Sequence, residues 1–248
     1  MNFVFQKLVS LVVLLWLCFG HGVSQDLSGT WQLPRNKVWA HRVNDIATAQ
    51  AKENAFGGME VDIIYSQFQN QLLVCHDTQD TLNGLTLEQW FAALQNPSEH
   101  GYWLDVKDLN YQSADTVSSM IRDILTRYNV VNLAFVESWD PWVLQKVKRH
   151  HLHTSLWVDS FQWSDLDTTA WVAKVNQLAD IAQPDALSCE FGMFGALTEF
   201  FPQKNIFLWH TPAKLNLENV KLTLKLCQHP SVKIVLVDYN PPKKTMKP

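Results

Sequence analysis

Residues 38–44 read VWAHRVN, and this stretch decides the fold because an apolar run of β type ends abruptly in polar side chains. The same pattern recurs downstream, in GMEVD at 58–62, VCHD at 74–77 and LDVK at 104–107. In a barrel of parallel strands the carboxyl ends of the strands share one rim, where such proteins place their functional groups. We therefore expect these polar side chains to meet at the mouth of a barrel.

The rest of the chain alternates between β-type and helical runs, which is typical of an α/β fold with a parallel sheet. The predicted barrel strands lie at 38–43, 59–65, 102–106, 132–136, 154–158, 186–189, 206–209 and 232–237, with an extra extended run at 71–75. Eight such strands favour a (β/α)8 TIM barrel over an open doubly wound sheet. The chain has no GxGxxG or GxxxxGK[ST] phosphate loop, which argues against a nucleotide fold.

The length and composition fit one large domain with a buried core. The chain has 248 residues, of which 47% are hydrophobic, and a net charge of −4. No basic stripe with interleaved aromatic residues is present, so we expect no nucleic-acid partner. Of the four cysteines, Cys18 lies in the N-terminal apolar run, and the other three, Cys75, Cys189 and Cys227, are widely spaced and odd in number. We therefore expect free thiols and not a disulfide framework or a zinc site.

The N-terminus has the features of a secretory signal peptide. Lys7 precedes an apolar run over 8–19, which is too short to span a bilayer comfortably. The small residues Gly22 and Ser24 predict cleavage after Ser24, giving a signal peptide at 1–24 and a single domain at 25–248. Cys18 raises the alternative of a lipid anchor, but the bulky Leu17 before it disfavours that. We expect a secreted or periplasmic protein without a stable membrane span, and an uncleaved anchor is a third option.

Three acids at the strand ends predict a cation site. Glu60 and Asp62 are two residues apart, so both side chains point to the same face of one strand. Two carboxylates in a barrel mouth repel each other and are costly to bury unless a cation lies between them. Asp105, at the end of the next barrel strand, adds a third oxygen donor, and such ligands suit Mg²⁺ or Ca²⁺. The alternative is three surface or salt-bridged acids.

Two histidines and two cations complete the candidate site. His41 and His76 lie at strand ends, and two imidazoles on opposite sides of a phosphodiester can act as base and acid near neutral pH. Arg42 offers a planar fork to a phosphate and Lys107 a point charge. The alternative for Lys107, and also for Arg42, is that the side chain only neutralises the acids.

The order His-Arg, Glu-x-Asp, His-Asp, acid-x-Lys resembles the glycerophosphodiester phosphodiesterase family of the phospholipase-C-like barrels. This resemblance implies that His41 and His76 are the acid–base pair. It also implies that a divalent metal binds to Glu60, Asp62 and Asp105, and that Arg42 and Lys107 contact the phosphate. The usual His-Arg-Gly is His-Arg-Val-Asn here, the Pro-Glu-Asn-Thr that follows it is missing, and the acid before Lys107 is Asp.

These departures are closer to the menorin family, a branch of the same superfamily. Its Trp-Ala-His-x-Val-Asn pattern matches residues 39–44, and its Leu-Thr-x-Glu-x-Trp helix matches residues 85–90. The Leu-Asp-x-Lys strand matches 104–107, and the similarity is strongest over 38–110. This match supports the fold more than it identifies a substrate.

The sequence therefore predicts a secreted, metal-dependent phosphodiesterase that acts on a small phosphodiester or a lipid-derived one. The first alternative is a non-catalytic, menorin-like binding protein that retains a cation site. A metal-dependent sugar or aldol enzyme ranks last, because it gives no reason for an arginine beside the first histidine.

Overall fold

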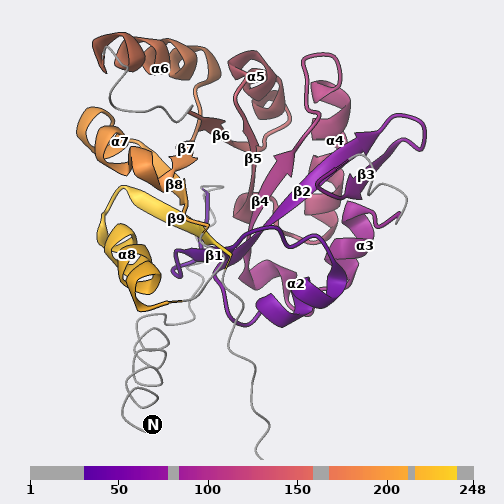
Figure 1. The fold of residues 1–248 in the computed structure, drawn as a ribbon. Coiled ribbons are helices and arrows are strands. Elements are labelled where there is room, and N and C mark those ends of the chain that lie inside the picture. The colour runs from indigo at the N-terminus through magenta and orange to yellow at the C-terminus, as the bar shows by residue number, and fades with distance from the viewer. Residues whose placement is uncertain (1–30, 78–83, 159–167, 212–215, 239–248) are drawn as a thin grey trace, which may run out of the picture.

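The structure, a computed structural model, describes residues 31–77, 84–158, 168–211 and 216–238. Eight parallel strands form a closed barrel in the order β1-β2-β4-β5-β6-β7-β8-β9, because β1 pairs with both β2 and β9 (Figure 1). The strands are β1 Val38–Ala40, β2 Gly58–Ser66, β4 Gly101–Val106, β5 Ala134–Ser138, β6 His153–Trp157, β7 Ala186–Glu190, β8 Asn205–Trp209 and β9 Val232–Val237. The predicted (β/α)8 barrel is confirmed.

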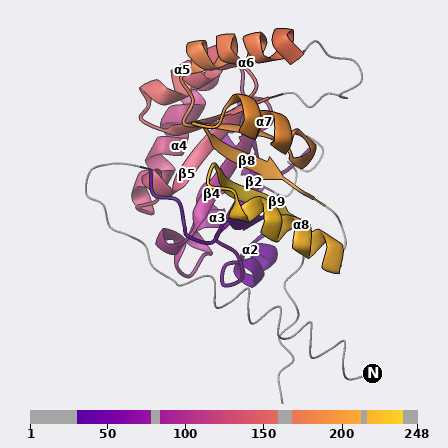
Figure 2. The ribbon, with the colours of Figure 1, turned by 90° about the vertical axis from the view of Figure 1, so that its left-hand side faces the viewer.

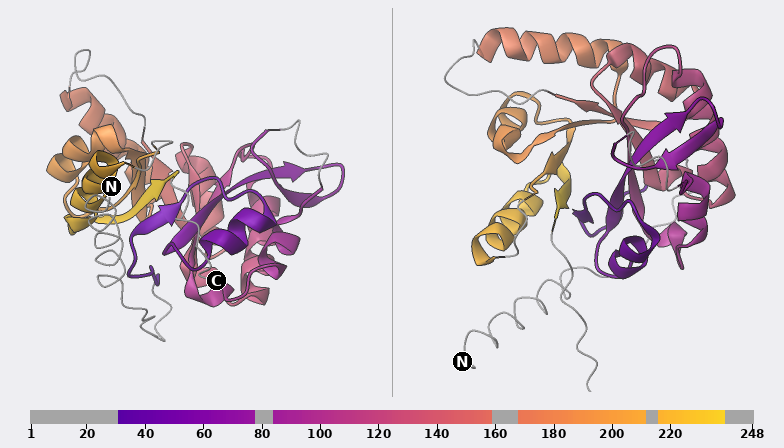
Figure 3. Two further views of the ribbon diagram at one scale, coloured as in Figure 1. Left: turned by 60° about the horizontal axis from the view of Figure 1, so that its bottom comes forward. Right: turned by 45° about the vertical axis from the view of Figure 1, so that its right-hand side comes forward.

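Helices connect successive strands and lie outside the ring of strands, as the right panel of Figure 3 shows. They are α2 Ile46–Lys52, α3 Leu87–Ala92, α4 Ala114–Arg127, α5 Pro141–Arg149, α6 Thr168–Ala182, α7 Phe194–Phe200 and α8 Leu217–Gln228. Figure 2 shows α6 at the opposite end of the view from α2. Side chains fix several helix starts: Asp45 accepts from the Thr48 amide, and Thr86 and Gln89 form a capping box.

The extra strand β3, Gln71–Val74, lies outside the barrel. It runs antiparallel to the second half of β2, so that β2 and β3 form a hairpin beyond the barrel mouth. The Cys75 amide donates to the Asp62 carbonyl oxygen at 3.1 Å. This bond places the following residue, His76, beside the end of β2 where the acids lie.

One strand starts later than the sequence predicted. Residues Val131–Leu133 form a 3₁₀ turn, and β5 begins at Ala134, two residues after the predicted start at 132. The apolar run continues through the turn, so hydrophobicity alone did not mark the boundary. As a result the strand extends to Ser138 and includes Glu137, which becomes part of the barrel wall.

Aromatic rings fill the barrel away from the mouth. Trp39, Trp103, Phe135 and Phe207 are buried in one cluster with residues from β7 and β9. Trp31 closes this end, with its ring stacked on His153 at 5.0 Å between centroids. The described residues that precede β1 thus pack under the barrel.

Cys75, Cys189 and Cys227 are free cysteines, and the first two are buried. Among the described residues no helix is long and apolar enough to cross a membrane. The predicted signal peptide at 1–24 lies outside the described residues.

Candidate active site

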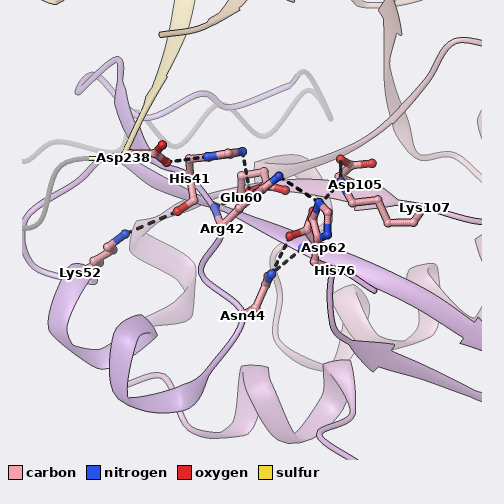
Figure 4. Close-up of polar contacts among 10 residues, drawn as sticks. All are labelled: His41, Arg42, Asn44, Lys52, Glu60, Asp62, His76, Asp105, Lys107 and Asp238. Atoms are coloured by element: carbon pink, nitrogen blue, oxygen red, sulfur yellow. Dashed lines mark hydrogen bonds and ion pairs between the residues drawn. The ribbon is translucent and has the colours of Figure 1, made fainter. Parts of the chain in front are cut away.

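The structure brings the predicted site residues together at the mouth of the barrel (Figure 4). Glu60 and Asp62 come from β2 and Asp105 from β4, where Asp62 and Asp105 are register partners. One carboxylate oxygen from each of these three acids lies within 4.8 Å of the other two. The spacing that predicted a shared face on β2 therefore produces a compact three-acid cluster.

The electrostatics of this cluster fit a bound cation. Glu60 is fully buried, and burial together with the charges of Asp62 and Asp105 raises its pKa well above the ordinary value. A positive charge stabilises the ionised form of a buried carboxyl group that lies beside two other carboxylates. Three carboxylates are hard oxygen donors of the kind that Mg²⁺ and Ca²⁺ prefer, so the residues fit the divalent cation that the sequence predicted.

Lys107 lies across the same cluster. Its Nζ is 2.7 Å from Oδ1 of Asp62 and 2.6 Å from Oδ2 of Asp105. Burial opposes the charge of the ammonium, but the two acids outweigh it and raise the pKa of Lys107 above its ordinary value. Lys107 therefore neutralises part of the acid cluster, as one of the two alternatives for this residue predicted.

Asn44 orients one of the acids, a role that sequence reasoning missed. Its Nδ2 donates to Oδ2 of Asp62 at 2.6 Å, and its Oδ1 accepts from the Asp62 amide at 3.0 Å. Burial alone would raise the pKa of Asp62, but the hydrogen bonds from Lys107 and Asn44 outweigh it and lower the pKa. The cap of α2 is Asp45, which leaves Asn44 available for this contact.

The backbone of Arg42 turns sharply at the end of β1. Its φ of 52° lies in the left-handed region, which residues with a side chain adopt rarely. This turn lets the Arg42 amide donate to Oε2 of Glu60 at 2.5 Å. Backbone strain of this kind concentrates at functional sites, and here it fixes one acid of the cluster.

His41 forms a pair with Asp238, which directly follows β9. The Nδ1 atom of His41 is 2.6 Å from Oδ1 of Asp238, and its Nε2 is 3.9 Å from Oε2 of Glu60. The carboxylate accepts the Nδ1 proton, so the neutral ring presents an unprotonated Nε2 toward the acid cluster. Burial lowers the pKa of His41, and it outweighs the opposing effect of Asp238. The ring is therefore neutral at pH 7.

His76 and Arg42 form a second pair at the acid cluster (Figure 4). Nη2 of Arg42 is 3.0 Å from Nε2 of His76, and Nδ1 of His76 is 3.1 Å from Oδ1 of Asp77. A guanidinium can only donate, so Nε2 accepts and the proton of this ring sits on Nδ1. Asp77 thus holds the tautomer of His76.

Glu137 is a further acid in the barrel that sequence reasoning did not place in the site. It is the register partner of Asp105, is buried, and accepts a hydrogen bond from Oγ of Ser188. Burial, and next the charge of Asp105, raise the pKa of Glu137 to about 8. The carboxyl is therefore mostly protonated at pH 7 and adds little charge to the mouth.

No family model and no curated protein matches the sequence. Solved structures do match the fold, among them two phosphodiesterases. A phosphodiesterase from Oleispira antarctica, solved with the product sn-glycerol-3-phosphate, has 16% identity and a TM-score of 0.61 over 84% of this chain and 94% of its own. A glycerophosphodiester phosphodiesterase from Parabacteroides distasonis has 15% identity and a TM-score of 0.59 over 82% of this chain and 93% of its own.

At these identities the likeness concerns the fold. This chain therefore has the barrel fold of these phosphodiesterases, as the sequence resemblance implied. The closer resemblance to menorins stays a prediction.

Proposed function

We propose that this protein is a secreted, metal-dependent phosphodiesterase that hydrolyses a glycerophosphodiester or a lipid-derived phosphodiester. One observation supports this above all: the three-acid cluster shares the barrel mouth with two histidines, each of which has a carboxylate at its Nδ1. The fold shared with phosphodiesterases, one of them solved with sn-glycerol-3-phosphate, supports the same class of substrate.

The cation site consists of Glu60, Asp62 and Asp105. A divalent cation bound there supplies Lewis-acid polarisation of a phosphoryl oxygen. Asn44 and the Arg42 amide hold two of these acids in place before any ligand arrives. Such preorganisation means that little reorganisation is needed when the substrate binds.

His41 acts as the general base in this proposal. Its pKa is lowered, so Nε2 is free to accept a proton at neutral pH, and Asp238 stabilises the imidazolium that forms. The proton comes from the nucleophile, either water or a neighbouring hydroxyl of the substrate. His76 protonates the leaving alkoxide oxygen from its doubly protonated form: its Nε2 takes up a proton once the Arg42 guanidinium turns from this ring to the phosphate, and Asp77 holds the Nδ1 proton.

Arg42 and Lys107 compensate the negative charge that develops on the phosphoryl group. The Arg42 side chain extends to His76, so its guanidinium stands beside the proposed acid. Lys107 is fixed by two of the cluster acids and places its ammonium at the same edge. A planar guanidinium can donate two hydrogen bonds to a phosphate, and the ammonium adds a point charge.

The test is hydrolysis of bis(p-nitrophenyl) phosphate and of glycerophosphocholine with Mg²⁺, Ca²⁺ or EDTA. We expect turnover that needs the cation and is absent in Glu60→Gln/Asp62→Asn. The control is Asp123→Asn, which removes an exposed carboxylate from α4 and should hydrolyse both substrates like the wild type. Turnover in EDTA, or turnover in the double variant, would contradict the proposal.

The menorin-like alternative, a non-catalytic protein with a cation site, predicts a different result in the same assay. It predicts cation binding by calorimetry that is lost in Glu60→Gln/Asp62→Asn, with no turnover of either substrate under any condition. Secretion is tested separately, by sequencing the N-terminus of protein recovered from the medium. Cleavage after Ser24 would give Gln25 as the first residue.

A further inference from the structure

Large apolar side chains are exposed almost exclusively at one end of the barrel. The described residues include eight of them, and seven follow the carboxyl end of a strand or begin the helix after it. Five of these seven are aromatic: Phe68, Tyr111, Trp139, Trp142 and Trp157. We call these five the aromatic rim. Because strand-to-helix loops all lie at the mouth of a (β/α)8 barrel, the aromatic rim lies at the same end as the candidate active site, along the strand ends from β2 to β6.

The exposure of the aromatic rim is large. Phe68, at the tip of the β2–β3 hairpin, is 99% exposed, and Trp139 and Trp142 are 65% and 53% exposed. The eighth exposed apolar residue, Phe200, ends α7 at the opposite end of the barrel and is 37% exposed. Single exposed apolar residues are ordinary, but their concentration around one opening marks an interaction surface.

An apolar cavity opens within the aromatic rim. It has a volume of about 270 Å³ and lies between the loop after β5 and helix α6. Trp139 and Trp157 line it on the rim side, and Trp171, Val175 and Leu178 line it on the α6 side. Apart from Lys174, the described lining is apolar. A cavity of this kind suits an alkyl chain better than it suits water.

The cavity is linked to the acid cluster by packed rings. Trp157 contacts Trp209 with 5.9 Å between ring centroids, and Trp209 contacts Trp103 at 6.3 Å. The Trp103 side chain donates a hydrogen bond to Glu137, the register partner of Asp105. The aromatic rim is therefore packed continuously onto the barrel wall that carries the acid cluster.

The charges near the mouth indicate which apolar partner fits. Exposed acids follow several strands at this end: Asp45, Asp77, Asp108 and Glu190. Exposed cations at the same end are Arg42 and Lys107, and Lys107 is paired with Asp62 and Asp105. Arg127, Arg149 and Lys225 occupy the last turns of α4, α5 and α8 at the far end. This distribution opposes docking of the mouth on an anionic surface, and is compatible with a surface of no net charge.

We propose that the aromatic rim docks on a zwitterionic lipid surface, with the cavity between Trp139 and Trp157 receiving an alkyl chain. Indole and phenol rings favour the boundary between lipid and water, because one side of the ring is apolar and the other is polar. The biological role of this docking rests on the proposed function, since docking would present the phosphodiesters of that surface to the acid cluster. Docking itself needs no turnover.

The experiment is hydrogen exchange of the full chain, in EDTA, with and without phosphatidylcholine vesicles. We expect vesicles to slow amide exchange at residues 66–71 and 138–145 and to leave residues 198–204 unchanged. This readout locates the contact on the barrel, so any binding by the apolar run at residues 8–19 cannot imitate it. No slowing at 66–71 and 138–145, or equal slowing at both ends of the barrel, would overturn the inference.

A matched pair of variants provides the second measurement, vesicle co-sedimentation. In Trp139→Ser/Trp142→Ser, vesicles should no longer slow amide exchange at 138–145. Vesicle binding should weaken about tenfold or more, because two indoles no longer enter the lipid boundary. Phe200→Ser removes an exposed ring from the opposite end and should leave binding unchanged. Equal loss in both variants would contradict the docking surface.

Two further outcomes separate the alternatives. Binding that requires phosphatidylglycerol, with slowed exchange at the last turns of α4 and α5, would overturn the inference in favour of the cationic end. Association between copies of the chain that disappears in Trp139→Ser/Trp142→Ser, without vesicle binding, would overturn it in favour of a protein interface. Turnover of glycerophosphocholine without vesicle contact would contradict only the proposal that the aromatic rim docks on lipid. Vesicle contact without turnover would contradict only the proposed function.

Discussion

The mouth of the barrel has two unlike sides. On the side of β1, β2, β4 and β9 the side chains are ionic and are held by hydrogen bonds, as in the pairs of Asn44 with Asp62 and of His41 with Asp238. On the side of β5 to β8 the side chains are aromatic and are held by ring packing, as in the contact of Trp157 with Trp209. Hydrogen bonds fix atoms in place for chemistry, whereas rings offer contact area with little specificity. Under the proposed function, this difference assigns the reaction to the ionic side and substrate capture to the aromatic side.

The largest expected effect on the ionic side is that of Asp62→Asn. The change removes a ligand of the proposed cation and the 2.7 Å partner of Lys107. Cation-assisted charge stabilisation is worth several kcal/mol, so we expect kcat/KM for glycerophosphocholine to fall about 10³-fold or more. Calorimetry should show weaker binding of the cation. Turnover above a tenth of the wild-type value would show that the acid cluster is not where the reaction takes place.

The next largest effect concerns the two histidines. His41→Gln and His76→Gln should each lower kcat by about 10² to 10⁴, the usual contribution of a positioned acid or base. Glutamine keeps a polar side chain of similar reach, so folding should be unaffected and circular dichroism serves as the control. Wild-type turnover in either variant would rule out the two-histidine mechanism.

Asp238→Asn should have a smaller effect that depends on pH. The carboxylate positions His41 and raises its pKa, while burial lowers it. Without the carboxylate we expect a loss of about 10 to 100-fold, as for other residues that orient a functional side chain. The pKa of His41 should fall further, so the acid limb of the kcat profile should move to lower pH. A purely structural role would lower activity without moving that limb.

The smallest effect is on stability, and it concerns Glu137, the acid at the border between the two sides. With a pKa of about 8 in the folded chain and an ordinary value of 4.5, the folded state holds an extra proton between these pH values. The free energy of unfolding therefore decreases as pH rises through this window, by up to about 1.4 kcal/mol per unit. Glu137→Gln should lack this slope. Urea unfolding of both proteins in EDTA at pH 5 and pH 8 measures it, and parallel slopes would show that Glu137 is ionised.

The predictable part of this protein is the part encoded by local pattern. Apolar runs followed by polar residues gave the strands and the three-acid cluster, because alternate residues of a strand share a face. Asp238 was missed as the partner of His41 because the two residues are 197 positions apart. Barrel closure predicts that the first and last strands pair, but only the register of Ala40 with Val237 places the next residues side by side.

Other residues were missed for different physical reasons. The predicted strand ended at 136, but the 3₁₀ turn before β5 shifted the strand, so that Glu137 lies within the wall beside Asp105. Asn44 precedes Asp45 directly, and asparagine and aspartate both cap helices well, so the local sequence does not separate their roles. Which of Asn44 and Asp45 caps the helix depends on the contact of Asn44 with Asp62, 18 residues further along the chain. Helix propensity, which depends on neighbouring residues, does not predict that contact.

The hairpin of β2 and β3 has a consequence for how such a barrel can diversify. The three acids belong to barrel strands, whereas the proposed acid, His76, is supplied by an excursion over residues 67–76 that lies outside the ring. Exchanging that excursion would change the proton donor while the cation ligands stayed in register. Replacing this one insertion between β2 and β4 would therefore be enough to change a hydrolase into a cation-binding protein with the same barrel.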